Sequence, residues 1–131
     1  MSERARKWPN GLTATATHDT KRGEDARMRI LAIAELAGDW ASAIGRWKTL
    51  NARLVTEARG QRCPSIVDEY MIYQALVGAT PLDGITPDFV ERFQQYMQKA
   101  TREEKLHSSW LNPNADYEDG VRAFVAGILD V

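Results

Sequence analysis

Apolar residues recur at helical spacing along most of this chain, from about residue 23 to the C-terminus. The first predicted helix begins near Gly23 or Glu24, since Glu24 and Asp25 would place two acids in its first turn, where the helix dipole favours them. Gly38 is a plausible C-terminal stop. The expected buried stripe is Ile30, Ile33, Ala34 and Ala37. This spacing predicts an amphipathic helix.

Two more helices follow. Asp39 would cap the second, and its expected buried face is Trp40, Ala43, Ile44, Trp47, Leu50 and Leu54. Gly60 and Pro64 bracket a loop. Ser65 with Asp68 resembles a capping box for the third helix. That helix carries Tyr70, Tyr73, Leu76 and Val77 and ends near Gly78 and Pro81.

The fourth helix has the clearest start signal. Thr86 supplies a capping hydroxyl, and Pro87 suits the first helical position because its missing N–H has no partner there anyway. A fifth helix begins after Pro113, capped by Asn114 or Asp116. The expected core positions of these two helices are Phe89, Val90, Phe93, Met97 and Ala100, then Tyr117, Val121, Phe124, Val125, Ile128 and Leu129. Five apolar faces predict an all-α fold, an irregular bundle of about five amphipathic helices.

The first twenty residues differ from the rest. Residues 12–17 are small and Thr-rich, and they predict a short, weak strand that runs into a polar turn. The chain therefore divides into residues 1–20 and a helical subdomain of residues 21–131.

Composition and charge exclude several classes of function. Hydrophobic residues make up 44% and charged residues 27%, and the net charge of −1 predicts no general attraction to nucleic acid or to a membrane. The basic cluster Arg4, Arg6 and Lys7 is better interpreted as a frayed, solvated terminus than as a nucleic-acid site. No apolar run approaches the length of a membrane span, and no signal peptide is visible.

Cys63 is the only cysteine, which excludes an intrachain disulfide and a cysteine-based zinc site and fits a cytoplasmic location. We interpret it as an unreactive thiol, because neither His18 nor His107 is placed by the sequence to activate it. We expect no cofactor and no metal.

One stretch concentrates chemistry: residues 17–25, with the sequence THDTKRGED. Asp19 at a strand end could accept hydrogen bonds from vicinal sugar hydroxyls and offset a developing oxocarbenium ion. His18 could donate to another hydroxyl, and Lys21 could reach a further sugar ring. The residues alone equally allow a polar helix entry, with Asp19 or Thr20 as the cap. Metal binding is disfavoured because His18 and Asp19 are adjacent, are expected to point apart, and have no third ligand signalled nearby.

Residues 14–29, ATATHDTKRGEDARMR, resemble the last conserved region of the α-amylase superfamily, in the version found in maltooligosyltrehalose synthases. Three later blocks resemble the same family: residues 69–78 its EYLLYQTLVG, residues 96–105 its YMxKAxREAK, and residues 108–118 its TSWxxPNxxYE. The departures, at Ala26, Glu104 and Ser108, do not touch the His-Asp pair. Each block alone is moderately specific, but the four blocks in this order make the resemblance specific to this family.

The resemblance implies an activity and roles for residues. Members of the family convert the reducing-end α-1,4 bond of a maltooligosaccharide into an α,α-1,1 bond by intramolecular transglycosylation, an isomerase reaction. By carry-over, Asp19 would be the catalytic carboxylate that stabilises the transition state. His18 and Lys21 would bind the substrate, and Lys21 would contact the glucose that turns over.

The resemblance also implies that the chain is a piece of the enzyme. A retaining glycosyl transfer needs a nucleophile and an acid/base carboxylate roughly 5–5.5 Å apart, and nothing here resembles either motif. Residues 1–20 would be a remnant of the seventh strand of a (β/α)8 barrel with its catalytic loop, and residues 21–131 a helical excursion before the eighth. The chain alone is therefore expected to be inactive, and its exposed N-terminal segment is a candidate surface for self-association.

Two alternatives stay open: an autonomous helical module that binds carbohydrate or protein, and part of another glucanotransferase of the superfamily. Within residues 99–110, Lys99, Arg102, Glu103 and Lys105 could line a substrate cleft or form a solvated, ion-paired helix face, and the second interpretation is favoured. The aromatic residues Trp40, Trp47, Tyr73 and Phe93 are expected in the core rather than in a sugar-stacking platform.

Overall fold

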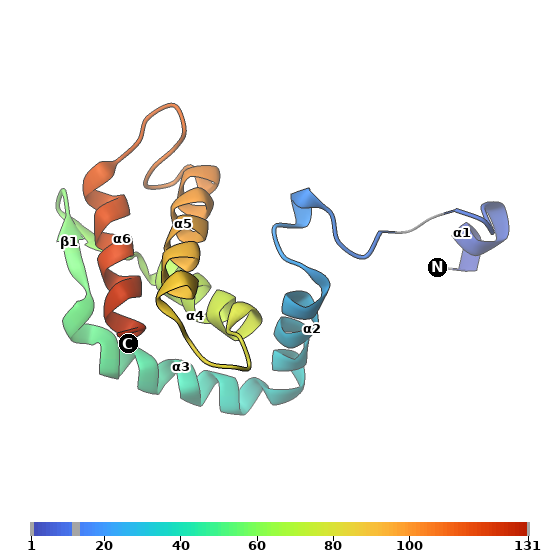
Figure 1. The fold of residues 1–131 in the computed structure, drawn as a ribbon, viewed down its shortest axis with the longest axis horizontal. Helices are drawn as coiled ribbons and strands as arrows, with labels where there is room; N and C mark the ends of the chain where they lie inside the picture. Colours follow the sequence, from blue (N-terminus) through green and yellow to red (C-terminus); the bar gives the residue numbers. More distant parts are fainter. Residues whose placement is uncertain (1, 12–13, 131) are drawn as a thin grey trace.

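The computed structural model describes residues 2–11 and 14–130. Helix α3 (Ala37–Asn51) forms the base of the molecule, and α2, α4, α5 and α6 lie above it (Figure 1). These helices are α2 (Glu24–Ala32), α4 (Ile66–Ala79), α5 (Pro87–Glu104) and α6 (Ala115–Ile128). Helix α2 packs against α4, and α5 packs against α6. The all-α class predicted from the sequence is therefore confirmed.

The core lies where α4, α5 and α6 meet. Its buried residues on these helices are Ile72, Tyr73, Ala75, Phe89, Phe93, Met97, Tyr117, Val121, Phe124 and Val125. The expected apolar faces of the fourth and fifth predicted helices are thus confirmed. The first is not, because α2 has no buried residue, and the expected stripe residues Ala34 and Ala37 are exposed.

Capping residues set three of the helix starts. The Ser65 hydroxyl accepts from the Asp68 N–H at 3.0 Å, and the Thr86 hydroxyl accepts from the Phe89 N–H at 3.2 Å. The Asn114 side chain accepts from the Tyr117 N–H at 3.4 Å. All three caps agree with the sequence prediction, because a side-chain oxygen there satisfies an N–H that has no partner in the helix.

The boundary between the first two helices was predicted wrongly. Gly38 does not end a helix and Asp39 does not cap one, because both lie in the first turn of α3, which follows a 3-10 turn, Ile33–Leu36. No close contact requires glycine at position 38, since nothing lies within 4 Å of the Cβ it lacks. The boundary is set by the tertiary packing of α3, whose Ile44 is buried and whose Trp40 and Trp47 pack against the core.

A β-hairpin was missed in the predicted loop. After a 3-10 turn (Ala52–Leu54), strand β1 (Thr56–Ala58) pairs antiparallel with β2 (Gln61–Cys63). The two-residue loop Arg59-Gly60 has φ of 52° and 79°, as a type I′ hairpin turn requires at both positions. Three-residue strands carry too little periodicity to be recognised in a sequence, and contacts with α6 hold this pair in place.

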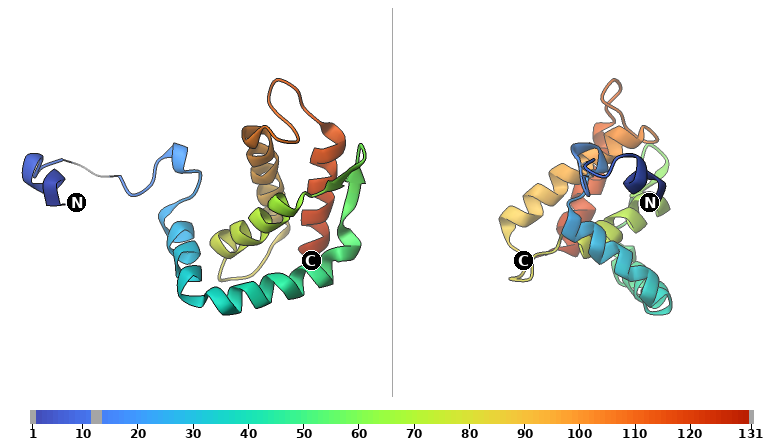
Figure 2. Two further views of the ribbon diagram at one scale, coloured as in Figure 1. Left: turned by 180° about the vertical axis from the view of Figure 1, so that it is seen from behind. Right: turned by 90° about the vertical axis from the view of Figure 1, so that its right-hand side faces the viewer.

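The N-terminal region lies apart from the helical body, as Figure 1 and the left view of Figure 2 show. Residues 2–7 form a short exposed helix, α1 (Ser2–Lys7), where a frayed terminus was expected. The predicted strand at residues 12–17 is not seen: residues 14–17 are irregular, and residues 12–13 lie outside the described residues. A strand needs a neighbouring strand to satisfy its backbone groups, and no described residue offers one here.

Candidate functional site

The THDTKR segment forms one tight turn between the irregular segment and α2. His18–Thr20 make a single 3-10 turn, and the Thr20 hydroxyl holds it closed by donating to the Thr17 carbonyl at 2.7 Å and to the Arg22 carbonyl at 3.1 Å. The Thr17 N–H in turn donates to that hydroxyl at 3.2 Å. Lys21, which directly follows the 3-10 turn, has a left-handed backbone conformation with φ of 57°. The sequence therefore fixes this loop locally, through one threonine hydroxyl.

His18 and Asp19 project from this turn into solvent. Their side chains are 86% and 77% exposed. His18 Nε2 lies 3.1 Å from Asp19 Oδ1, so the expectation that the two side chains point apart was wrong. Neither caps an α-helix, because Gly23 is the N-cap of α2. Both are thus free to contact a ligand. No cluster of three metal-ligating residues occurs in the part of the chain that the structure describes.

Arginines anchor the turn and α2 to their surroundings. Arg22 donates to the Gln74 side chain of α4 at 3.1 Å, and Arg29 donates to the Thr80 carbonyl at the end of α4 at 2.6 Å. Arg27 reaches back to the Thr15 carbonyl. The turn is consequently held against α4 even though its own side chains are exposed.

A groove of about 770 Å³ opens beside the turn, and α5 forms its other wall. The residues that line the groove include His18 and Lys21 from the turn and Tyr96, Lys99 and Glu103 from α5. Lys21 Nζ lies 3.5 Å from Glu103 Oε2 across the groove. Asp19 does not line it. The structure therefore brings two of the three predicted site residues to one groove, with Asp19 beside them in the sequence.

Tyr96 was not considered for the site from the sequence, and Glu103 was named only in a block for which the solvated, ion-paired interpretation was favoured. Their signal was present, because residues 96, 99, 100 and 103 follow the spacing that puts side chains on one face of a helix. The sequence could not show that this face lies opposite the THDTKR turn.

The block at residues 99–110 divides into two groups of side chains. Lys99 and Glu103 line the groove. Arg102 instead donates to both carboxylate oxygens of Glu118 on α6, at 2.8 and 2.7 Å, and stacks 4.9 Å from the centre of the Trp110 ring. The Arg102 hydrogen bonds are the main reason that the pKa of Glu118 falls to about 2. This second group is structural.

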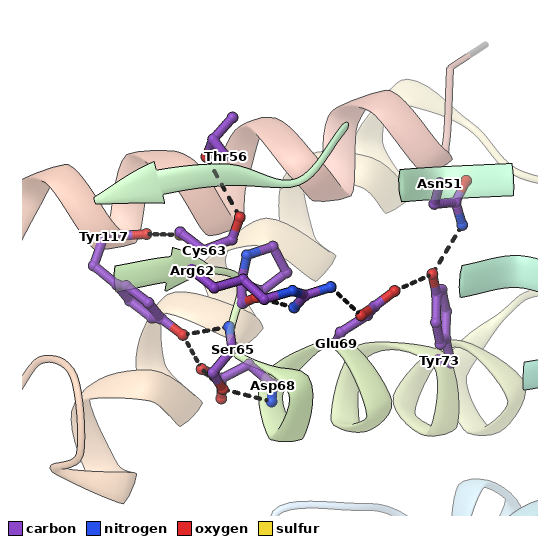
Figure 3. A network of polar contacts seen from close by, with 10 residues as sticks. Asn51, Thr56, Arg62, Cys63, Ser65, Asp68, Glu69, Tyr73 and Tyr117 are labelled. Atoms are coloured by element: carbon purple, nitrogen blue, oxygen red, sulfur yellow. Dashed lines mark hydrogen bonds and ion pairs between the residues drawn. The ribbon is translucent and has the colours of Figure 1, made fainter. Parts of the chain in front are cut away.

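A buried polar network lies away from the groove and joins the hairpin to α3, α4 and α6 (Figure 3). Arg62 pairs with Glu69 at 2.6 Å, Glu69 accepts from the Tyr73 hydroxyl at 2.9 Å, and the Asn51 amide donates to that hydroxyl at 3.0 Å. The Cys63 thiol donates to the Tyr117 carbonyl at 3.3 Å.

This network has the character of a core and not of a reaction centre. Burial raises the pKa of the Cys63 thiol to about 11 and that of the Tyr73 hydroxyl to about 12. Both groups therefore stay protonated near neutral pH, in agreement with the interpretation of Cys63 as unreactive. Tyr73 was likewise expected in the core and is buried there.

The chain is similar to known proteins along nearly its whole length. The chain is 37% identical over 128 residues to proteins named maltooligosyl trehalose synthase from two strains of Mycobacterium tuberculosis, CDC 1551 / Oshkosh and ATCC 25618 / H37Rv. The match covers 97% of this chain and 15% of each relative's length. No protein-family model matches the chain.

The fold also has a counterpart among solved structures. The crystal structure of a hypothetical maltooligosyl trehalose synthase from Sulfolobus tokodaii superposes with a TM-score of 0.75 at 35% identity, over 92% of this chain and 16% of that one. Fold and coverage together define the class: an all-α unit that matches one part of much larger enzymes. The chain is a homologue of one segment of the maltooligosyl trehalose synthases.

No helix in the described residues combines the length and the apolar character needed to cross a membrane.

Proposed function

We propose that this chain contributes the THDTKR turn and its helical support to a maltooligosyl trehalose synthase. That enzyme would convert the reducing-end α-1,4 bond of a maltooligosaccharide to an α,α-1,1 bond by intramolecular transglycosylation. The observation that carries the proposal is the turn itself: a hydroxyl-locked loop that presents His18 and Asp19 to solvent beside a groove. The similarity along 97% of the chain supports it.

Each site residue has a physical role in this proposal. The negative charge of Asp19 offsets the positive charge that develops on the sugar ring, and its oxygens accept from sugar hydroxyls. His18 contacts Asp19 at 3.1 Å and donates to the same sugar. Lys21, on the groove wall, contacts the glucose that turns over.

The chain by itself would not catalyse the reaction. Retaining transfer needs two further carboxylates, and the chain spans only 15% of the length of the curated relatives it matches. Residues 1–20 would belong to the barrel and residues 21–131 to a helical subdomain of the larger enzyme. The proposed function requires no cofactor. It also does not require the isolated chain to bind sugar.

The test is Asp19→Asn in the longer enzyme, prepared as the M. tuberculosis relative with its 128 matching residues replaced by this chain. Asparagine keeps the size of the side chain and removes its charge. We expect turnover to fall by roughly 10²–10³, the typical loss for one preorganised electrostatic partner. The melting temperature should stay constant, because Asp19 is exposed and caps no α-helix.

A folded Asp19→Asn enzyme with near-normal turnover would remove Asp19 from the catalytic residues. A second experiment incubates the 131-residue chain alone with maltopentaose. It should form no non-reducing product. Any such product would contradict the need for the missing carboxylates.

A further inference from the structure

The backbone of Lys21 is fixed on both sides. Its N–H donates to the His18 carbonyl at 3.4 Å, and the Thr20 hydroxyl bridges the carbonyls of Thr17 and Arg22 around it. The Arg22 side chain then ties the following residue to α4. What the turn leaves free is the Lys21 side chain itself, a long and flexible stem with a charged end.

Glu103 lies close enough to restrict the movement of the Lys21 side chain. Its Oε2 is 3.5 Å from Lys21 Nζ, and the two side chains are 33% and 41% exposed. Helix α5 is itself firmly placed, because Met97 and Thr101 on it are buried against the core. The ion pair therefore links a mobile side chain in the groove to a rigid helix.

The position of Glu103 in its helix is unfavourable by itself. It is the penultimate residue of α5, and a carboxylate in the last turn is repelled by the negative end of the helix dipole. Helix stability therefore does not explain why a carboxylate stands at this position. The ion pair with the Lys21 ammonium across the groove does explain it.

Intramolecular transfer makes the position of the Lys21 ammonium important. The C1–O4 bond breaks as the nucleophilic carboxylate of the longer enzyme bonds to C1, and O4 of the released glucose takes a proton from the acid/base carboxylate. The same glucose then turns, its anomeric hydroxyl gives a proton back to the acid/base carboxylate, and the new C1–O1 bond replaces the bond between C1 and the nucleophile. If the glucose leaves first, water attacks instead and the products are glucose and a shortened maltooligosaccharide.

We infer that Glu103 is a positioning residue: it holds the Lys21 ammonium at the groove wall, where it retains the released glucose, and so favours transfer over hydrolysis. The inference rests on the proposed function. Glu103 acts through Lys21 and does not itself react.

The test measures free glucose against non-reducing product for the longer enzyme described above, with maltopentaose as substrate. Glu103→Gln should raise the ratio of hydrolysis to transfer by up to about fivefold, the scale of a half-exposed ion pair. Lys21→Met should raise the ratio at least as much. The double variant should match Lys21→Met alone, because Glu103 has nothing to position once the ammonium is gone.

Asp88→Asn is the matched control. It breaks the exposed pair between Asp88 and Arg92 on the same helix, at 2.9 Å, and Asp88 does not line the groove. Its product ratio should equal that of the unmodified enzyme, and a raised ratio would show that any lost charge on α5 has this effect.

An unchanged ratio in Glu103→Gln would overturn the inference, and so would effects of Lys21→Met and Glu103→Gln that multiply in the double variant. An unmodified enzyme that forms no non-reducing product would instead refute the proposed function. NMR relaxation of the Lys21 Cε methylene in the 131-residue chain measures the mobility of this side chain and so tests the ion pair independently of activity. Glu103→Gln should increase its mobility, and unchanged mobility would overturn the inference at that level.

Discussion

At the scale of single residues, two glutamates near the α5–α6 contact have pKa values shifted in opposite directions. Burial, together with a hydrogen bond to Asp68 and repulsion from its charge, raises the pKa of Glu104 to about 7. Asp68 Oδ1 and Glu104 Oε2 are both buried without a hydrogen-bond partner among the described residues, and a proton on the Glu104 carboxyl would turn one of these two acceptors into a donor. Glu118, paired with Arg102, has a pKa of about 2.

These shifts predict how stability depends on pH. The Glu104 pKa is higher in the folded chain than its ordinary value of 4.5, so its contribution is complete below about pH 4.5 and is lost as the pH rises to about 7. The Glu118 pKa is lower than 4.5, so its contribution is present above about pH 4.5 and is lost as the pH falls toward 2. We expect these two groups together to favour stability most near pH 4.5–5.

Urea unfolding of the 131-residue chain between pH 3 and 8 measures this, with Glu104→Gln as the comparison. A glutamine is neutral at every pH and can still donate to Asp68. The decline in the free energy of unfolding between pH 4.5 and 7 should therefore be smaller in the variant. Parallel curves for the two proteins would show that Glu104 does not titrate as described.

At the scale of elements, the hairpin and α6 pack so closely that one position requires glycine. A Cβ on Gly120 of α6 would lie 2.5 Å from the Cys63 sulfur and 3.4 Å from both the Cys63 Cβ and the Thr56 hydroxyl. Cys63 is fully buried and cannot move aside easily. The helix and the hairpin are therefore matched in shape at Gly120.

Gly120→Ala should lower the free energy of unfolding by about 1–3 kcal/mol, the usual cost of overpacking. Alanine normally stabilises a helix interior relative to glycine by roughly 0.5–1 kcal/mol. Gly45 in α3 is the matched control, because nothing lies within 4 Å of its missing Cβ. Gly45→Ala should raise stability where Gly120→Ala lowers it, and thermal or urea unfolding compares the two. Stabilisation by both would contradict the close packing.

At the scale of the whole molecule, order is concentrated in the assembly of α4, α5 and α6. Nearly all buried large side chains belong to these helices and to the hairpin among the described residues, whereas α2 buries none. Large apolar side chains of α2 and the 3-10 turn after it, Met28, Leu31 and Leu36, are 57–63% exposed. The N-terminal side of the molecule is accordingly the less stable one.

Amide hydrogen exchange of the 131-residue chain should show this gradient. We expect the slowest exchange in α4, α5 and α6 and faster exchange in α2, since protection follows buried contacts. The short helix α1 and residues 14–17 should exchange fastest, because a six-residue helix is marginal in water and residues 14–17 are irregular and mostly exposed. Protection of residues 14–17 equal to that of α5, in a sample shown to be monomeric, would contradict this. Protection that appears only on self-association would agree with the N-terminal segment as a self-association surface.

Much of the fold followed from local signals. Thr86 and Pro87 fixed the start of α5, Ser65 that of α4, and Asn114 that of α6, because a capping oxygen acts on N–H groups only a few residues away. The spacing of Phe89, Phe93 and Met97 identified the buried face of α5 for the same reason. The THDTKR turn was also found from the sequence, and a single hydroxyl within it holds its shape.

Tertiary contacts decided the remainder. The start of α3 and the existence of the hairpin depend on packing against α4 and α6, and no described residue offers a partner strand to residues 14–17. The sequence determined that His18, Asp19 and Lys21 would share one turn, since neighbours in the chain stay together in any fold. Only the tertiary structure placed Glu103 opposite Lys21, because 82 positions separate them along the chain and the packing of both the turn and α5 brings their side chains to 3.5 Å.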